Sequence, residues 1–78
     1  MTSSRSESLA SARRLLRMFD SAPEPRRQAR SICSDLARAH GWTAAEAKDI
    51  EALRVWLEEL PPVAALKPRC EQVIRKLK

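Results

Sequence analysis

The sequence predicts an all-α protein, a small compact bundle or array of four amphipathic helices. Three observations lead to this prediction. The 78-residue chain has one glycine, no tyrosine and few β-branched residues, a composition that favours helix over sheet. Apolar residues recur at spacings of three and four in four separate segments. Prolines and the one glycine lie between these segments, so short connections are expected.

Composition limits the class of protein further. A chain of this length forms one domain with a small core. Apolar residues make up 44% of it and charged residues 32%, as in ordinary globular domains. No apolar run approaches the ~20 residues of a membrane span, and the charged N-terminus lacks the apolar stretch of a signal peptide. We therefore expect a cytoplasmic protein.

The first helix is predicted over about 6–20, after a flexible, serine-rich N-terminus at 1–5; residues 6–78 form the domain. Ser4 and Glu7 have the spacing of a capping box. The apolar side of this helix consists of Leu9, Ala12, Leu15, Leu16, Met18 and Phe19. The opposite side is basic and carries Arg13, Arg14 and Arg17. Prolines at 23 and 25 then interrupt the helix.

The second helix is predicted over about 24–40, with Pro25 in its first turn, where a missing N–H is no loss. Its apolar stripe is the most regular in the chain and comprises Ala29, Ile32, Cys33, Leu36, Ala37 and His40. Its other positions hold Arg26, Arg27, Arg30 and Arg38. Gly41 follows, and we expect it to be the left-handed C′ residue that ends the helix.

The third helix is predicted over about 43–60, because Thr43 and Glu46 form a second capping box and a pair of prolines follows Leu60. Its stripe comprises Ala47, Ile50, Leu53, Leu57 and Leu60, with Trp56 at the border.

The fourth helix is predicted over about 62–77. Its apolar residues are spaced 3, 4, 3 and 4: Val63, Leu66, Cys70, Val73 and Leu77. The phase runs through Pro68, so we expect one helix bent at that proline. The alternative is a short turn over 62–66 followed by a helix that begins at Pro68.

The net charge of +5 is unevenly distributed. Residues 1–42 carry a net +4, residues 43–60 a net −3 and residues 61–78 a net +4. An acidic third helix between basic segments would steer a charged partner. Solvated faces that keep a small domain soluble are the simpler interpretation.

The region around Gly41 resembles the helix-turn-helix motif of DNA-binding regulators. Ala37 and Gly41 have the spacing of its small residue and glycine, and Leu36 and Trp42 occupy the flanking apolar positions. The resemblance implies that the third helix, with Ala47 and Ile50 facing inward, would enter the major groove. The exposed positions of this helix hold Ala44, Ala45, Glu46, Lys48 and Asp49, however, and carboxylates are repelled by phosphates. A plain corner between two helices is the alternative.

Two further groups of residues have alternative interpretations. A nucleic-acid surface would use the arginines of the first two helices together with the start of the third: Arg13, Arg14, Arg17, Arg26, Arg27, Arg30, Thr43 and Lys48. The simpler interpretation is a set of solvated charges. Cys33 and Cys70 both fall on apolar stripes, so we expect buried free thiols, and a disulfide between helices two and four is the alternative.

We find no pattern typical of an enzyme or of a cofactor site. One histidine provides neither a metal-binding pair nor a triad, and one glycine cannot form a phosphate-binding loop. The neighbouring carboxylates Glu58 and Glu59 diverge on a helix. We therefore expect no catalytic residues, no metal and no cofactor.

The sequence is thus interpreted as a small regulatory protein that binds a protein partner, as an adaptor, inhibitor or regulatory subunit, or that associates with a second copy as a homodimer. The alternative is a DNA-binding regulator of the helix-turn-helix type. Val55 is apolar but lies outside the stripe of the third helix, beside Trp56. The predicted protein-binding surface comprises Glu51, Arg54, Val55, Trp56, Glu58 and Glu59.

Overall fold

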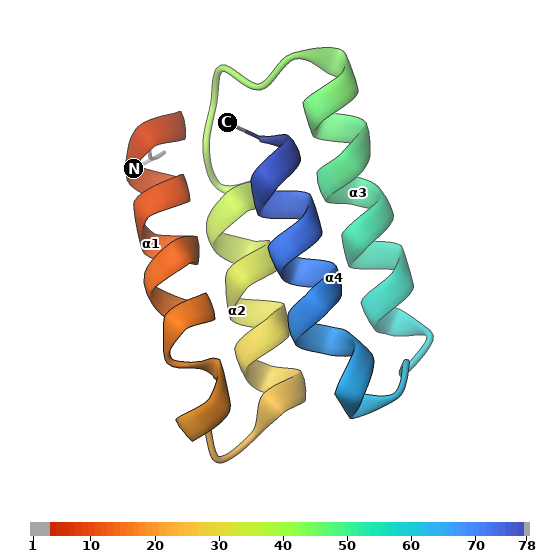
Figure 1. The fold of residues 1–78 in the computed structure, drawn as a ribbon. Helices are drawn as coiled ribbons and strands as arrows, with labels where there is room; N and C mark the ends of the chain where they lie inside the picture. The colour runs from red at the N-terminus through yellow and green to blue at the C-terminus, as the bar shows by residue number, and fades with distance from the viewer. Residues whose placement is uncertain (1–3, 78) are drawn as a thin grey trace.

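Four helices run alternately up and down and enclose a single core (Figure 1). The computed structural model describes residues 4–77. The helices are α1 (Arg5–Arg17), α2 (Pro25–Ala37), α3 (Ala44–Glu58) and α4 (Val63–Lys76), with a short 3₁₀ turn, η1 (Phe19–Ser21), after α1. The predicted all-α fold is confirmed.

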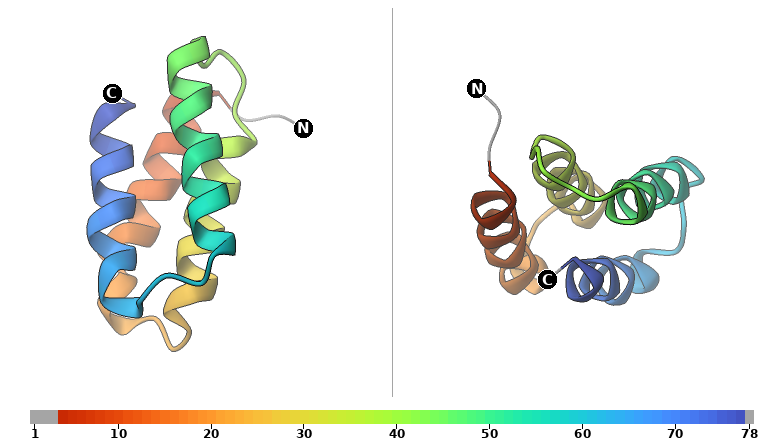
Figure 2. Two further views of the ribbon diagram at one scale, coloured as in Figure 1. Left: turned by 90° about the vertical axis from the view of Figure 1, so that its right-hand side faces the viewer. Right: turned by 90° about the horizontal axis from the view of Figure 1, so that it is seen from above.

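Seen along the bundle, the helices occupy four corners (Figure 2). Each helix packs against its neighbours in the chain, and α1 also packs against α4. The pair α2 and α4 makes an additional contact across the diagonal. The half of the bundle that α2 and α3 form therefore lies opposite the half that α1 and α4 form.

Local signals in the sequence explain where most helices begin. The Ser4 hydroxyl accepts a hydrogen bond from the Glu7 amide, and Thr43 does the same for Glu46, so both predicted capping boxes are present. Pro25 occupies the first turn of α2. Helix α4 continues through Pro68 as one helix, as its unbroken apolar phase predicts, and the alternative of a separate turn over 62–66 is wrong.

The core consists of the inward-facing residues of all four helices and the aromatic ring of η1: Leu9, Ala12, Phe19, Ala29, Ile32, Cys33, Leu36, Ile50, Leu53, Leu57, Leu66, Cys70, Val73, Ile74 and Leu77. Most of the predicted stripes are therefore buried. The segment 1–5 is predicted to be flexible, and its residues 1–3 lie outside the described residues. Ser4 caps α1, and Arg5 is the first residue of this helix.

Six residues predicted on the apolar sides are exposed instead: Met18, Ala37, His40, Ala47, Leu60 and Val63. Each lies within one turn of a helix end or just beyond it. Helix α1 ends at Arg17, α2 at Ala37 and α3 at Glu58, all two or three residues before the predicted ends. Met18, His40 and Leu60 lie beyond a helix end and no longer follow the helical period, whereas Ala37, Ala47 and Val63 lie in the terminal turns of their helices.

Gly41 has a φ of +90°, which confirms the expected left-handed conformation. It does not directly follow α2, however, because that helix ends at Ala37 and Arg38 caps it. Gly41 instead lies within the connection between α2 and α3, before Thr43.

Candidate protein-binding surface

The outer face of α3 is defined by its relation to the core. Ile50, Leu53 and Leu57 are buried against the other helices. At about 100° per residue, Val55 lies on the side of the helix opposite these three residues. Its side chain is 43% exposed. The structure therefore confirms that Val55 is an apolar residue outside the core, as the helical phase predicts.

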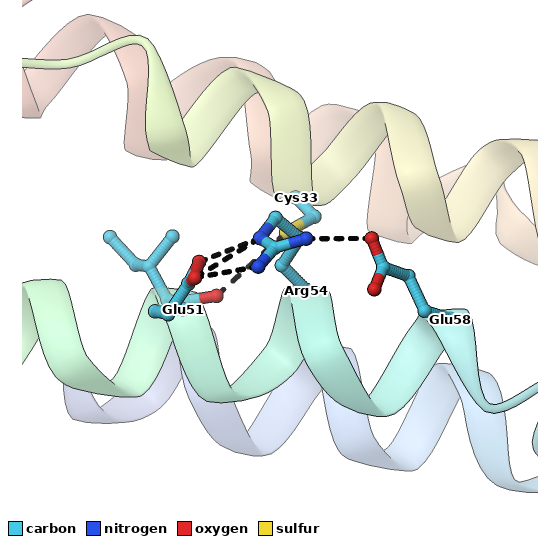
Figure 3. Close-up of polar contacts among 5 residues, drawn as sticks. Cys33, Glu51, Arg54 and Glu58 are labelled. Carbon is cyan, nitrogen blue, oxygen red and sulfur yellow. Dashed lines mark hydrogen bonds and ion pairs between the residues drawn. The ribbon is translucent and has the colours of Figure 1, made fainter.

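Glu51, Arg54 and Glu58 form an ion-paired group on α3 (Figure 3). The Arg54 guanidinium donates to both oxygens of the Glu51 carboxylate, from Nε to Oε1 at 2.6 Å and from Nη2 to Oε2 at 2.7 Å. Its Nη1 donates to Glu58 at 2.6 Å. One arginine thus holds two carboxylates, one a turn before it and one a turn after it.

These hydrogen bonds have an electrostatic consequence. Those from Arg54 lower the pKa of the Glu51 carboxyl, and the same contacts raise the pKa of Arg54. Both groups therefore keep their charges at neutral pH. Because all three side chains are tied to one another, they form a charged rim that loses less side-chain entropy on binding than free side chains would.

A groove of about 350 Å³ lies between α2 and α3, next to this rim. Its apolar lining comes from Cys33, Ala37 and Leu57. Its charged edge consists of Arg30, Arg54 and Glu58. The groove and the outer face of α3 are therefore separated only by the Arg54 group.

Trp56 follows Val55 in the chain but faces another side of the helix. Its ring is half-buried and packs against the core. The Arg69 guanidinium of α4 lies 5.2 Å from the ring centroid, in cation–π contact. Trp56 therefore lies at the α3–α4 boundary, whereas Val55 and the exposed Glu59 point to solvent. The predicted surface residues are thus divided between two sides of α3.

The structure adds exposed apolar residues that the sequence analysis had assigned to the core. Leu60 is 61% exposed and Val63 is 47% exposed, and both lie at the α3–α4 connection. Met18, after α1, is 56% exposed. The Pro61–Pro62 pair, which predicted a helix end at Leu60, also disfavours the helical conformation at Leu60 itself, because this residue precedes a proline. Leu60 indeed leaves the helix and has a φ of +54°.

The predicted nucleic-acid residues are distributed over α1, α2 and the start of α3. On α2, Arg26 donates to the Pro61 carbonyl at 2.8 Å and Arg27 pairs with Glu24 at 3.3 Å. Arg30 stands exposed at the edge of the α2–α3 groove. Thr43 is occupied as the cap of α3, and Lys48 is exposed on that helix.

Two of the three arginines of α1, Arg13 and Arg17, lie away from α2. Helix α1 contacts α2 through Ser11, which donates to Asp35 at 2.5 Å, and through the Leu15 carbonyl, which accepts from Gln28 at 2.8 Å. By helical spacing, Arg13 and Arg17 lie on the other side of α1.

The turn at Gly41 joins two antiparallel neighbours, α2 and α3, which lie side by side (Figures 1 and 2). In a helix-turn-helix motif the two helices cross at about 90–120°. The two alanines that the motif would bury, Ala37 and Ala47, are exposed.

Cys33 and Cys70 are free and buried. Burial raises the pKa of the Cys70 thiol to about 12 and also raises the pKa of Cys33. Both are therefore neutral thiols at physiological pH and poor nucleophiles. Within residues 4–77, no three His, Cys, Asp or Glu side chains are grouped so that they could hold a metal ion. None of the helices in this range is long and apolar enough to cross a membrane.

Comparison of the chain with protein-family models, with curated proteins and with solved structures found no match.

Proposed function

We propose that this is a small regulatory protein without enzymatic activity, which acts by binding another protein through the outer face of α3. The observation that carries the proposal is Val55, an exposed apolar side chain opposite the buried stripe of its own helix. Valine is a weaker helix former than most residues, and its apolar side chain is exposed to water at this position. Burial against a partner would compensate for both.

The surroundings of Val55 suit such an interface. Protein interfaces have an apolar centre and a polar rim. Here the rim is the Glu51–Arg54–Glu58 group, in which Arg54 is ion-paired with both carboxylates. Charged rims of this kind govern orientation and association rate more than affinity. The groove beside the rim offers room for a side chain of the partner.

Two observations support the absence of enzymatic activity. The chain's one histidine, His40, is exposed in the α2–α3 connection. The two thiols are buried and neutral, so neither is an activated nucleophile.

Site-specific photo-crosslinking in the native host tests this proposal. A benzophenone amino acid at position 55 should yield a discrete protein adduct, whereas the same probe at the exposed Gln72 of α4 should not. Val55→Asp should leave the helicity and melting temperature nearly unchanged and should abolish binding of the partner identified in this way. Sedimentation of the purified protein shows whether the partner is a second copy. If Val55→Asp unfolds the chain, or if both probe positions give the same adducts, the proposal is wrong.

A further inference from the structure

The positive charge of the bundle is concentrated in one half. Residues 24–59, which include α2 and α3, carry six basic and seven acidic residues. The remaining described segments, 4–23 and 60–77, carry eight basic residues against three acidic ones. These segments form α1 and α4, which pack against each other on the opposite side from α2 and α3 (Figure 2).

Four of the eight basic residues of this half are already engaged. Arg5 pairs with Glu46, Lys67 with Asp20 and Arg75 with Glu71, and Arg69 lies over the Trp56 ring. Glu7, the acidic residue of α1, serves in the capping box at the start of that helix.

Three arginines of α1 differ from these. Arg13, Arg14 and Arg17 make no ion pair with any residue of 4–77. Arg14 and Arg17 are exposed, and Arg13 is half-buried.

Helical spacing brings these three side chains together on α1. Arg14 and Arg17 lie on the side of α1 away from its buried residues, Ser8, Leu9 and Ala12, and the half-buried Arg13 lies at the border beside Leu9. Like charges at spacings of three and four repel each other, so this arrangement does not stabilise the helix through its side-chain pairs. The three residues form a cationic surface on a rigid helix, which we call the α1 arginine face.

We propose that the α1 arginine face binds the phosphate backbone of double-stranded nucleic acid, independently of base sequence. Guanidinium groups match phosphate oxygens in a bidentate geometry. Proteins that bind single strands combine a cationic groove with aromatic rings on which bases stack. The three aromatic residues of the chain lie elsewhere: Phe19 is buried, Trp42 packs beside Arg5, and Trp56 lies between α3 and α4. A duplex, whose phosphates are read without stacking, is therefore the ligand that this face suits.

The test compares two triple variants with equal loss of charge. Arg13, Arg14 and Arg17 are replaced by Gln in one, and Arg27, Arg38 and Arg75 in the other. Each arginine of the second set is exposed and ion-paired with a carboxylate of its own helix or of that helix's N-cap. Fluorescence anisotropy with a labelled mixed-sequence DNA duplex of about 20 base pairs, over about 50 to 200 mM salt, gives the affinity and its salt dependence. Circular dichroism confirms that both variants are folded.

The α1 variant should lose at least about tenfold in affinity, and its salt slope should fall by about 2 to 3, since each lost phosphate contact contributes roughly 0.9. The matched variant should lose less than about threefold, because its guanidinium charges are already compensated. Val55→Asp should retain the affinity of the wild type, which separates this face from the proposed protein-binding face.

Three results would overturn the proposal. The wild type could fail to bind the duplex at about 50 mM salt, where phosphate contacts are strongest. The two triple variants could lose affinity equally, which would assign binding to net charge alone. Poly-glutamate or vesicles of anionic phospholipid could bind as tightly as the duplex with the same dependence on α1, which would assign the face to another class of polyanion.

Discussion

The two ends of the bundle are built differently. At one end α1 and α3 begin and α2 and α4 finish (Figure 1). We call it the capped end, because both capping boxes lie there. At the other end α1 and α3 finish and α2 and α4 begin. We call it the open end, because neither helix that begins there has a side-chain cap and because Met18, Leu60 and Val63 are exposed there.

Arg5 links the elements of the capped end. Its Nη2 donates to Glu46 of α3 at 2.5 Å and to the Leu77 carbonyl at 3.4 Å, and its guanidinium lies 5.1 Å from the Trp42 ring centroid. The Trp42 indole donates in turn to the Leu36 carbonyl at 2.8 Å. Two contacts connect the loops of the open end to the helices, the Arg26 bond to the Pro61 carbonyl and the Lys67–Asp20 pair. The capped end therefore has more polar and aromatic contacts between its elements than the open end, where Met18, Leu60 and Val63 are exposed.

The largest effect should come from Trp42. Trp42→Ala removes a half-buried ring, its hydrogen bond and its cation–π contact, and should lower the free energy of unfolding by about 2 to 3 kcal/mol. Leu60→Ala at the open end should change it by less than about 0.5 kcal/mol, because that side chain is mostly exposed. Urea denaturation of both variants checks the comparison. Equal losses would show that the open end is as tightly packed as the capped end.

The next test uses the two residues with positive φ, one at each end. Gly41→Ala should cost about 1 kcal/mol, because a Cβ is strained at a φ of +90°. The space around it is not the cause, since the added Cβ would make ordinary contacts of 3.7 Å with Arg5. Leu60→Gly should have the opposite sign and stabilise by about 0.5 to 1 kcal/mol, because leucine is strained at a φ of +54°.

Thermal and urea unfolding of both single variants and of the double variant measure these effects. The residues lie at opposite ends, so the two effects should add in the double variant. A destabilising Leu60→Gly would contradict the inference that Leu60 is strained.

Much of this contrast could be predicted from local sequence, and part of it could not. The capping boxes Ser4–Glu7 and Thr43–Glu46 each join residues three positions apart, so the sequence predicts them. The 3, 4, 3, 4 spacing of apolar residues around Pro68 likewise predicts one continuous helix. The contacts of Arg5 join residues 41 and 72 positions apart, and no local pattern reports such pairs. The exposure of Leu60 depends on where α3 ends, and helix ends are the least certain feature of a periodic pattern.

The same division holds for the candidate surfaces. Exposure of Val55 follows from helical phase, and the Arg54 pairs follow from spacings of three and four. Sequence did not show that Trp56 turns toward Arg69, because that contact depends on how α3 and α4 pack. It also did not show which of the arginines of α1 and α2 are ion-paired.

Acid should weaken the capped end through Glu46. A hydrogen bond from the Thr43 amide, together with Arg5, lowers the pKa of the Glu46 carboxyl. The carboxylate therefore contributes stability above the ordinary glutamate pKa of about 4.3, and this contribution is lost as the pH falls through the lower pKa of the folded state. Glu46→Gln should thus destabilise the protein at pH 7 and lose this disadvantage near pH 3. Urea midpoints at both pH values measure the difference. A difference that stays constant between them would contradict the role of the charge.

The smallest effect should come from Val63, the first residue of α4. The first turn of this helix contains no acidic residue, and Pro62 before it provides no side-chain cap. Val63→Glu places a negative charge near the positive end of the helix dipole and should stabilise by about 0.3 kcal/mol, whereas Val63→Lys should destabilise by a similar amount. Both substitutions remove the same apolar contacts, so the difference between their melting temperatures isolates the charge. If both variants instead lose more than about 1 kcal/mol, the contacts of Val63 with the bundle outweigh its exposure, and the open end is part of the core.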